Sequence, residues 1–491
     1  MVEPSSCCAP SVQSSCCEPA AKESCCGSVD AGTAGSEGSS CGCAAGSAVA
    51  WAAVGAAEDD DGELPVAVIG AGPVGLAAAA HLLSRGIEPL ILEAGPSVGA
   101  SVRAWGHVRV FSPWEYNVDP AAEELLTASG WTAPAADSYP TGDEIAERYL
   151  EPLAALPRIA SALHLDARVE AVTRAGIDKL KDAGRDEAPF ELVVDEDGDE
   201  RRYLARAVID ASGTWTQPNP LGAGGVRAAG ERAQRDRIAY GIPDVLSAER
   251  ERYAGKRVLV VGSGHSAFNA ILDLVALRES EPATEVVWAI RGGAPGRRYG
   301  GGGDDQLPAR GALGAAVRTL VADGSVELVG GFQTRAVQER DGRLALVDGE
   351  TEIVADEVIA ATGFRPDLRM LGELRLDLDD RVEATRALAP LIDPNLHSCG
   401  SVPPHGVDEL AHPDAGIYMV GMKSYGRAQE ERGRAGYEQV RSVAAALAGD
   451  WESAREVDFV LPETGVCNGP AAACCGDGSP HEELVQIDTV A

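Results

Sequence analysis

The chain has 491 residues, roughly three domain equivalents, and 45% of them are apolar, which is enough to build large buried cores. No apolar run approaches the ~20 residues that span a bilayer, and no basic segment leads into an apolar one at the start, so we expect a cytoplasmic protein without a membrane span or signal peptide. The formal net charge of -34 repels phosphate backbones and argues against nucleic acid as a partner.

Residues 1–62 and 461–491 are predicted to be disordered tails rich in cysteine. They contain few large apolar side chains, so burial cannot offset the entropy of the chain. Adjacent cysteines recur every nine residues in the first tail, and another pair stands in the second. Such thiols suit a thiophilic metal or a metalloid such as As(III), and the alternative is a low-complexity tail that drifts under composition bias. The predicted ligands are Cys7, Cys8, Cys16, Cys17, Cys25, Cys26, Cys474 and Cys475.

The segment 64–93 contains the features of a Rossmann dinucleotide-binding unit in the required order. A short apolar run predicts a buried parallel strand, and Gly70, Gly72 and Gly75 then precede an Ala/Leu-rich helical pattern. The three glycines permit a tight turn, a close approach of the backbone to a pyrophosphate, and close packing of helix on strand. Glu93 ends the second strand, where a carboxylate accepts a hydrogen bond from a ribose hydroxyl.

The region between this unit and the next one predicts a capped helix and several strands. Thr141 and Glu144 have the spacing of a capping box at the start of a helix over 140–156. Alternating patterns over 163–172 and 190–194 predict strands, separated by a polar insertion at 174–189. The segment 205–214 then predicts a strand that ends in a turn of small residues at Gly213.

A second nucleotide unit follows the strand pattern at 258–261. Gly262, Gly264 and Ala267 stand in the three positions of the fingerprint, whose last position accepts alanine. The next strand ends on Arg291, where an acidic residue would suit NAD and an arginine would pair with the 2′-phosphate of NADP. The sequence therefore favours NADPH, and the alternative for Arg291 is a solvated strand end.

Together with the two glycine fingerprints, three further segments resemble those of the flavin-containing monooxygenase-like flavoproteins with two dinucleotide-binding domains. The segment 355–367 resembles the strand and ATG(F/Y)xPD turn that ends their NADPH domain, 205–214 resembles the turn that closes their first FAD segment, and 416–422 resembles the returning FAD segment. The resemblance implies an α/β fold of two Rossmann-like domains, with the NADPH domain inserted in the FAD domain. It also implies FAD and NADPH as cofactors, with Gly213, Thr362, Gly363 and Gly421 beside them. The predicted boundaries are 63–218 and 367–460 for the FAD-binding domain and 219–366 for the NADPH-binding domain.

The reaction class depends on the cysteines. Disulfide reductases keep a redox cysteine pair against the flavin, but the chain has no cysteine between Cys43 and Cys399. We therefore expect a monooxygenase in which NADPH supplies electrons, dioxygen is the oxidant and a soft nucleophile receives oxygen. His405 is the polar candidate for a catalytic role, and a structural histidine is the alternative reading.

The cysteine pairs suggest the substrate. Together with an NADPH-dependent flavoprotein core, they resemble the flavoprotein monooxygenases associated with arsenic resistance, which implies oxidation of a small trivalent arsenical in metalloid detoxification. Two alternatives stay open. One is a metalloid-binding chaperone or sensor, suggested by the charged run 427–434 where relatives usually carry apolar residues beside the flavin. The other is an N- or S-oxygenating monooxygenase unrelated to arsenic.

Overall fold

The computed structural model describes residues 63–293, 295–300, 302, 305, 307–349, 351–396, 405–428 and 433–456, all of which belong to one compact unit. Every cysteine of the chain, including the predicted metalloid ligands, lies outside these residues, so the structure does not test that site. No helix of the described part is long and apolar enough to cross a membrane. Nor do three or more His, Cys, Asp or Glu side chains gather there as a metal site.

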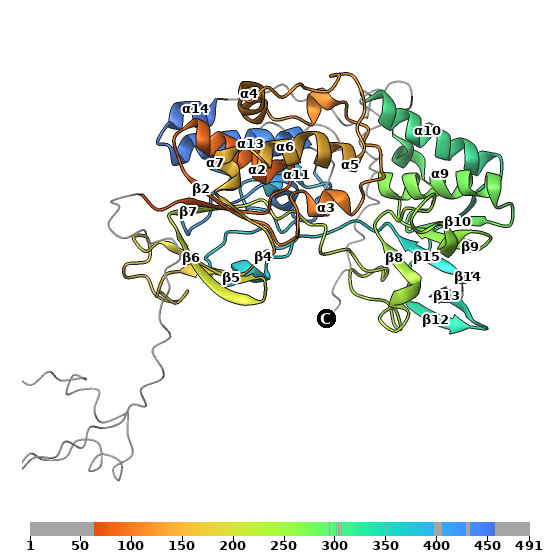
Figure 1. Cartoon of the computed structure of the whole chain (residues 1–491). Helices are drawn as coiled ribbons and strands as arrows, with labels where there is room; N and C mark the ends of the chain where they lie inside the picture. Colours follow the sequence, from red (N-terminus) through yellow and green to blue (C-terminus); the bar gives the residue numbers. More distant parts are fainter. Residues whose placement is uncertain are drawn as a thin grey trace, which may run out of the picture. The chain divides into compact units, whose positions relative to one another are not determined.

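The first sheet consists of five parallel strands in the order β16-β7-β1-β2-β3 (Figure 1). Successive side chains of β1 point to opposite faces, so Val66 and Val68 pack with helices α2 and α13, whereas Ala67 and Ile69 pack with the antiparallel sheet β4-β5-β6. This burial on both faces explains the continuous apolar run. The elements are β1 (Val66–Ile69), α2 (Pro73–Ser84), β2 (Pro89–Leu92), β3 (Leu163–His164), β4 (Ala167–Arg174), β5 (Phe190–Glu196), β6 (Asp199–Ala205), β7 (Ala207–Asp210), β16 (Ile417–Met419) and α13 (Gly433–Leu447).

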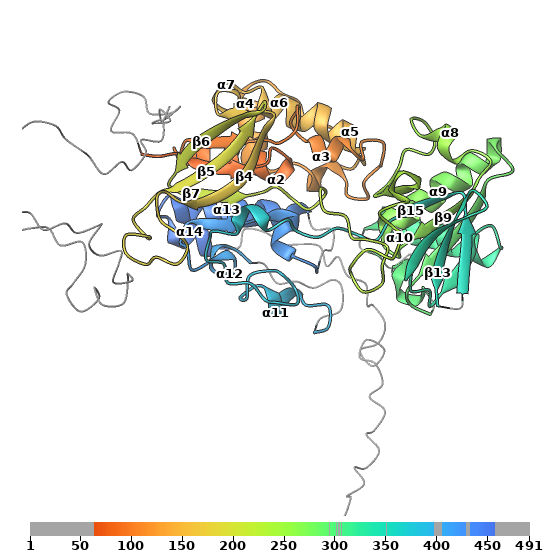
Figure 2. The same ribbon diagram turned by 90° about the horizontal axis from the view of Figure 1, so that it is seen from below.

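The second sheet repeats this plan with five parallel strands in the order β11-β10-β9-β15-β8. Figure 2 shows two of these strands, β9 and β15, with α9 and β13 beside them. Val258 and Val260 pack with α9, and Leu259 and Val261 pack with the antiparallel sheet β12-β13-β14. All strands of this sheet lie between the strands β7 and β16 in the sequence, so the predicted insertion of one Rossmann-like unit in another is confirmed. The elements are β8 (Ile238–Tyr240), α8 (Arg250–Tyr253), β9 (Arg257–Val261), α9 (His265–Ser280), β10 (Glu285–Ile290), α10 (Pro308–Ala322), β11 (Glu327–Gly330), β12 (Ala336–Arg340), β13 (Arg343–Asp348), β14 (Thr351–Ala355) and β15 (Glu357–Ala360).

Short helices surround the first sheet. The predicted capping box is present, because Thr141 accepts from the Glu144 N–H and the Glu144 carboxylate accepts from the Thr141 N–H. The predicted helix is broken, however, by a π-helical turn over Ala146–Leu150. The helices and turns are α3 (Ala100–Arg103), η1 (Trp114–Tyr116), α4 (Pro120–Ala128), α5 (Gly142–Ile145), η2 (Ala146–Leu150), α6 (Glu151–Ala154), α7 (Pro157–Ala160), η6 (Arg369–Leu371), α11 (Ala389–Ile392), α12 (Val407–Leu410), η7 (Gly421–Tyr425) and α14 (Trp451–Arg455).

A buried ion pair holds the polar insertion 174–189 against the returning part of the chain. Arg185 donates through two nitrogens to the two carboxylate oxygens of Asp414, each over 2.7 Å, and both side chains are at most 2% exposed. Burial alone would raise the pKa of Asp414, but the hydrogen bonds from Arg185 and from the Arg375 N–H lower it below its usual value. Arg185 and Asp414 lie 229 residues apart in the sequence, so their ion pair fixes two distant segments together.

We predict that Asp414→Asn lowers the free energy of unfolding by about 3–5 kcal/mol, because it leaves Arg185 buried without its anion. Urea unfolding at pH 7 measures this change. The exposed pair Arg386–Asp377 is the control, and Arg386→Ala should cost at most about 1 kcal/mol. The lowered pKa of Asp414 stabilises the wild type above the unfolded value of about 3.9, and this contribution is lost as the pH falls through the folded pKa. A deficit that does not shrink below pH 4 would contradict this assignment.

Candidate functional site

A cavity of about 1520 Å³ joins the carboxyl ends of the first sheet to residues of the second unit. This volume exceeds that of a pocket for one drug-sized ligand, so the cavity has room for more than one group. Eight of the predicted cofactor residues line it: Gly70, Gly72, Glu93, Gly213, Arg291, Thr362, Gly363 and Gly421. The remaining four, Gly75, Gly262, Gly264 and Ala267, are not among its lining residues.

The three glycines of the first unit meet different surroundings. A Cβ on Gly70, whose φ is +100°, would lie 2.9 Å from the carbonyl oxygen of Ala211, and a Cβ on Gly75 would lie 1.9 Å from the carbonyl oxygen of Gly70. A Cβ on Gly72 would meet no protein atom within 4 Å. Gly72 also precedes α2, whose N-terminus receives no hydrogen bond from a capping side chain. The cavity therefore reaches free N–H groups at the positive end of a helix, an arrangement that suits a pyrophosphate.

Glu93 connects the glycine turn to the cavity. Its Oε2 accepts from the Ala71 N–H over 2.7 Å, and its Oε1 accepts from the Gly95 N–H over 2.9 Å. Burial raises the pKa of Glu93, although these two N–H groups and the nearby Arg168 oppose the increase. The carboxylate holds the turn in place. Each of its two oxygens uses one lone pair for an N–H group and has another that can accept from a ribose hydroxyl.

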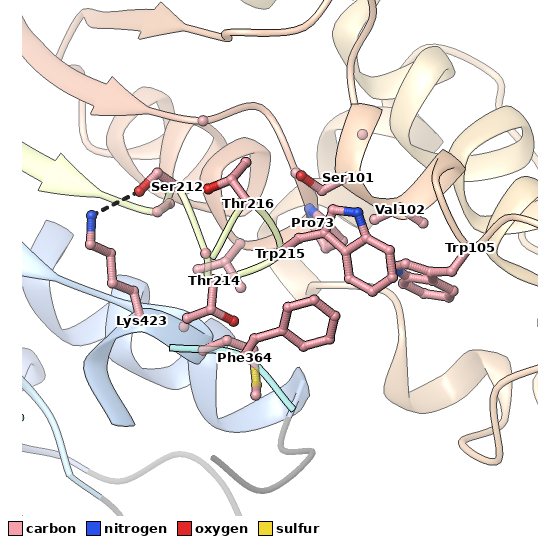
Figure 3. A pocket seen from close by; sticks show the side chains of 18 of the residues that line it. Pro73, Ser101, Val102, Trp105, Ser212, Thr214, Trp215, Thr216, Phe364 and Lys423 are labelled. Carbon is pink, nitrogen blue, oxygen red and sulfur yellow. Dashed lines mark hydrogen bonds between the residues drawn. The ribbon is translucent and has the colours of Figure 1, made fainter. Parts of the chain in front are cut away.

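Lys423 lines the cavity and belongs to a buried ion pair that we did not predict from the sequence. The Nζ of Lys423 lies 2.6 Å from Oδ2 of Asp210 and donates to Oγ of Ser212 over 3.0 Å, and neither charged side chain is exposed. Figure 3 shows this bond between Lys423 and Ser212 beside the turn at Thr214. Asp210 ends β7 and Lys423 follows β16, so the pair joins neighbouring strands. The sequence contains one hint of this pair, because Asp210 closes the apolar run of β7 and Lys423 is the first charged residue after the apolar run of β16.

The second unit has the same kind of glycine turn. A Cβ on Gly262, whose φ is +136°, would lie 2.0 Å from the carbonyl oxygen of Ala361. Gly264 precedes α9, whose N-terminus also lacks a capping side chain, and Ala267 is fully buried under the turn. Arg291 follows β10, lines the cavity and is exposed, with its Nη1 3.4 Å from the carbonyl oxygen of Ala223.

His405 does not line the cavity. It is 5% exposed, and its Nε2 lies 2.8 Å from Nε2 of Gln439 and 3.2 Å from the hydroxyl of Tyr425. Gln439 also accepts from the Gly421 N–H over 2.7 Å, so the network supports the turn that follows β16. The catalytic prediction for His405 therefore gains no support from the geometry, which favours the alternative reading of a structural histidine.

The sequence is similar to two curated proteins over different lengths. A ferredoxin–NADP reductase of Nocardioides sp. (strain ATCC BAA-499 / JS614) is 28% identical over 331 residues, which cover 65% of this chain and 78% of the reductase. The indole-3-pyruvate monooxygenase YUCCA1 of Oryza sativa subsp. japonica is 32% identical over 213 residues, which cover 42% of this chain and 44% of the monooxygenase.

Solved structures share the fold. The bacillithiol disulfide reductase Bdr of Bacillus cereus matches with a TM-score of 0.57 and 22% identity, covering 79% of this chain and 99% of that one. The FAD-bound cadaverine monooxygenase DfoA of Erwinia amylovora matches with a TM-score of 0.56 and 14% identity, covering 84% of this chain and 100% of that one. The family profile of the pyridine nucleotide-disulphide oxidoreductases matches residues 67–388. The chain therefore belongs to the pyridine nucleotide-disulphide oxidoreductase family and is an FAD- and NAD(P)H-dependent oxidoreductase.

Proposed function

We propose that this oxidoreductase is an NADPH-dependent flavoprotein monooxygenase that oxidises a soft nucleophile. The observation that carries the proposal is the cavity, which joins the glycine turn of the first unit to Ser266 and Arg291 of the second and has no cysteine among its lining residues. The chain has no cysteine between Cys43 and Cys399, so the redox disulfide of a disulfide reductase has no residues in the described core. In this proposal the electrons therefore pass to a diffusible acceptor, which is dioxygen in a monooxygenase.

The described residues fit both cofactors. When bound, FAD and NADPH supply the redox and oxygen chemistry. In this proposal the N–H groups at the start of α2 hold the FAD pyrophosphate, with Gly72 giving it access, and Glu93 accepts from the adenosine ribose. The turns at Gly213 and Gly421 border the same part of the cavity. In the second unit Gly262, Gly264 and Ala267 form the turn for NADPH, Arg291 pairs with its 2′-phosphate, and Thr362 and Gly363 border the cavity between the two cofactors.

Part of the remaining lining is apolar and suits oxygen transfer. Trp105, Trp215, Phe364 and Met422 present apolar surface to the cavity. Apolar walls exclude water, which protects a reactive oxygen donor from wasteful side reactions. One turnover consumes NADPH, H⁺ and O₂ with the substrate, and it yields NADP⁺, water and the substrate with one added oxygen atom.

A second candidate function is electron transfer without insertion of oxygen. The match to a ferredoxin–NADP reductase favours it, because that similarity extends over 78% of the reductase. In this case the acceptor would be an electron-carrying protein, and oxygen consumption would be slow and would end in hydrogen peroxide. An N- or S-oxygenating monooxygenase without any link to arsenic, and a metalloid-binding chaperone or sensor on a flavoprotein core, are the remaining alternatives.

Among soft nucleophiles we propose a trivalent arsenical as the first substrate to test. This choice depends on the adjacent cysteine pairs of the sequence, which include Cys7–Cys8, Cys16–Cys17 and Cys25–Cys26. Thiolates bind thiophilic metalloids, and a tethered ligand site raises the local concentration of substrate near the cavity. Oxidation of arsenite to arsenate would then use one O₂ and one NADPH.

We predict that arsenite or an organic trivalent arsenical accelerates NADPH oxidation by the purified yellow protein, with one oxidised arsenical formed per NADPH. Replacing the six cysteines of residues 7–26 by serine should raise KM for the arsenical but leave kcat nearly unchanged, because only capture of the substrate is lost. Oxygen uptake, NADPH absorbance and arsenic speciation measure the three quantities.

The controls separate the alternatives. Rapid reduction of ferredoxin with little oxygen uptake would replace the monooxygenase proposal by the electron-transfer reading. Oxygenation of an amine or sulfide, with no response to arsenicals, would retain the monooxygenase and remove arsenic. Arsenite binding by a colourless protein would support the chaperone reading.

We predict that Gly72→Val yields a folded protein without FAD. The structure leaves open space at the Cβ position, so the new side chain should not disturb the protein but should occupy the space beside the α2 N-terminus. Flavin absorbance and circular dichroism measure the two effects. Gly75→Val is the matched contrast, because its Cβ would collide with Gly70 and should reduce folding itself. Normal flavin content in Gly72→Val would remove this turn from FAD binding.

We predict that Arg291→Ala raises KM for NADPH by roughly 10- to 150-fold, since a charge-assisted bond is worth ~1.5–3 kcal/mol. KM for NADH should change little, because NADH lacks the 2′-phosphate. Steady-state kinetics with both nucleotides measure the difference. Arg335→Ala removes an exposed arginine outside the cavity and serves as the control. An equal loss with both nucleotides would show that Arg291 does not read this phosphate.

A further inference from the structure

Two connecting segments run between the sheets and are bonded to each other. The first, residues 211–219, follows β7, and the second, residues 361–367, follows β15. Asn219 joins them, because its N–H donates to the Gly363 carbonyl over 2.9 Å and its carbonyl accepts from the Thr362 hydroxyl over 2.6 Å. The Asn219 side chain bonds to the second segment as well, accepting from Nε of Arg365 over 2.8 Å. The segments therefore form one short two-stranded link rather than two independent loops.

Each connecting segment contributes one aromatic ring to a stacked pair. The ring centroids of Trp215 and Phe364 lie 4.6 Å apart, and their planes are inclined by 29°. Figure 3 shows the two rings lying against each other, with Trp105 nearby. Gly241 supports the pair from the second sheet, since a Cβ there would lie 2.9 Å from the Trp215 ring. The indole is therefore held by packing in one orientation.

The pair borders the cavity between its two nucleotide ends. Trp215 and Phe364 line the same cavity as Gly72 in the first unit and Arg291 in the second. A nucleotide that places its 2′-phosphate at Arg291 must extend its other end toward the first unit to deliver a hydride there. The segments that carry the two rings connect these units, so the rings lie beside that route.

We propose that Trp215, stacked on Phe364, is the surface against which the nicotinamide end of NADPH is positioned. A planar ring stacks favourably on an indole, and an indole that is already fixed loses little further freedom on binding. The proposal rests on the proposed binding of NADPH and adds a residue pair that the nucleotide motifs do not include. In this proposal Arg291 binds the 2′-phosphate at one end of NADPH, and Trp215 positions the nicotinamide at the other end.

The test compares two ligands on the flavin-loaded protein by isothermal titration calorimetry. NADP⁺ contains the nicotinamide, whereas adenosine 2′,5′-bisphosphate has the same adenosine and 2′-phosphate without it. We expect Trp215→Leu and Phe364→Leu to raise Kd for NADP⁺ by about two- to twelve-fold, the range expected for one aromatic contact, and to leave Kd for the bisphosphate unchanged. Trp215→Phe should retain most of the affinity. Arg291→Ala should weaken both ligands.

The controls make each outcome decisive. Trp451→Leu, which changes a half-exposed tryptophan outside the cavity, should change neither Kd. Equal weakening of both ligands in the leucine variants, unchanged affinity for both, or loss of flavin from both variants would overturn the proposal. So would a wild type that binds NADP⁺ no more tightly than the bisphosphate. None of these binding results depends on oxygen transfer, so a failed oxygenation assay would contradict the proposed reaction and leave this assignment standing.

Discussion

The fold of both units depends on a backbone-to-backbone contact that only glycine permits. Gly70 follows β1 and Gly262 follows β9, each with a positive φ, and each turn packs against the turn after the neighbouring strand. The hypothetical Cβ atoms would approach the carbonyl oxygens of Ala211 and Ala361 to 2.9 and 2.0 Å, closer than any side chain is tolerated. These contacts bring the carboxyl ends of adjacent parallel strands together. The cavity is formed at that edge, as expected for an open α/β sheet.

Features encoded by adjacent residues could be predicted from the sequence. The strand, glycine turn and helix of each unit depend on local periodicity and on the special freedom of glycine, so β1, α2, β9 and α9 could be anticipated. The capping box at Thr141 is equally local, and the structure contains it. The π-helical turn that interrupts the following helix had no comparable signal. Its position is set by how the helix packs, which the spacing of apolar residues does not specify.

The contacts that shape the cavity connect distant parts of the chain and had no local signature. Lys423 meets Asp210, and Phe364 meets Trp215, across separations of more than a hundred residues. Either aromatic ring could equally have been an ordinary core residue, and a lysine near a strand end is usually solvated. His405 shows the reverse situation. A histidine in a polar, proline-rich passage suggested chemistry, but its neighbours Tyr425 and Gln439 use its ring nitrogen for support of a turn.

Charge compensation distinguishes the basic residues of the cavity from one another. Lys423, Arg369 and Arg427 each lie within 3 Å of a carboxylate, those of Asp210, Asp367 and Glu383, so their charges are largely neutralised. Among the described residues, no carboxylate lies within 4 Å of the guanidinium of Arg291, or of Arg168 in the first unit, and the hydrogen-bond partner of Arg291 is the carbonyl of Ala223. A chain with a net charge of -34 repels anions at long range, but physiological salt screens that repulsion beyond about 8 Å. At short range an unpaired charge dominates the local potential, so in the proposed NADPH site an uncompensated arginine at this strand end would attract a phosphate that the rest of the protein would repel.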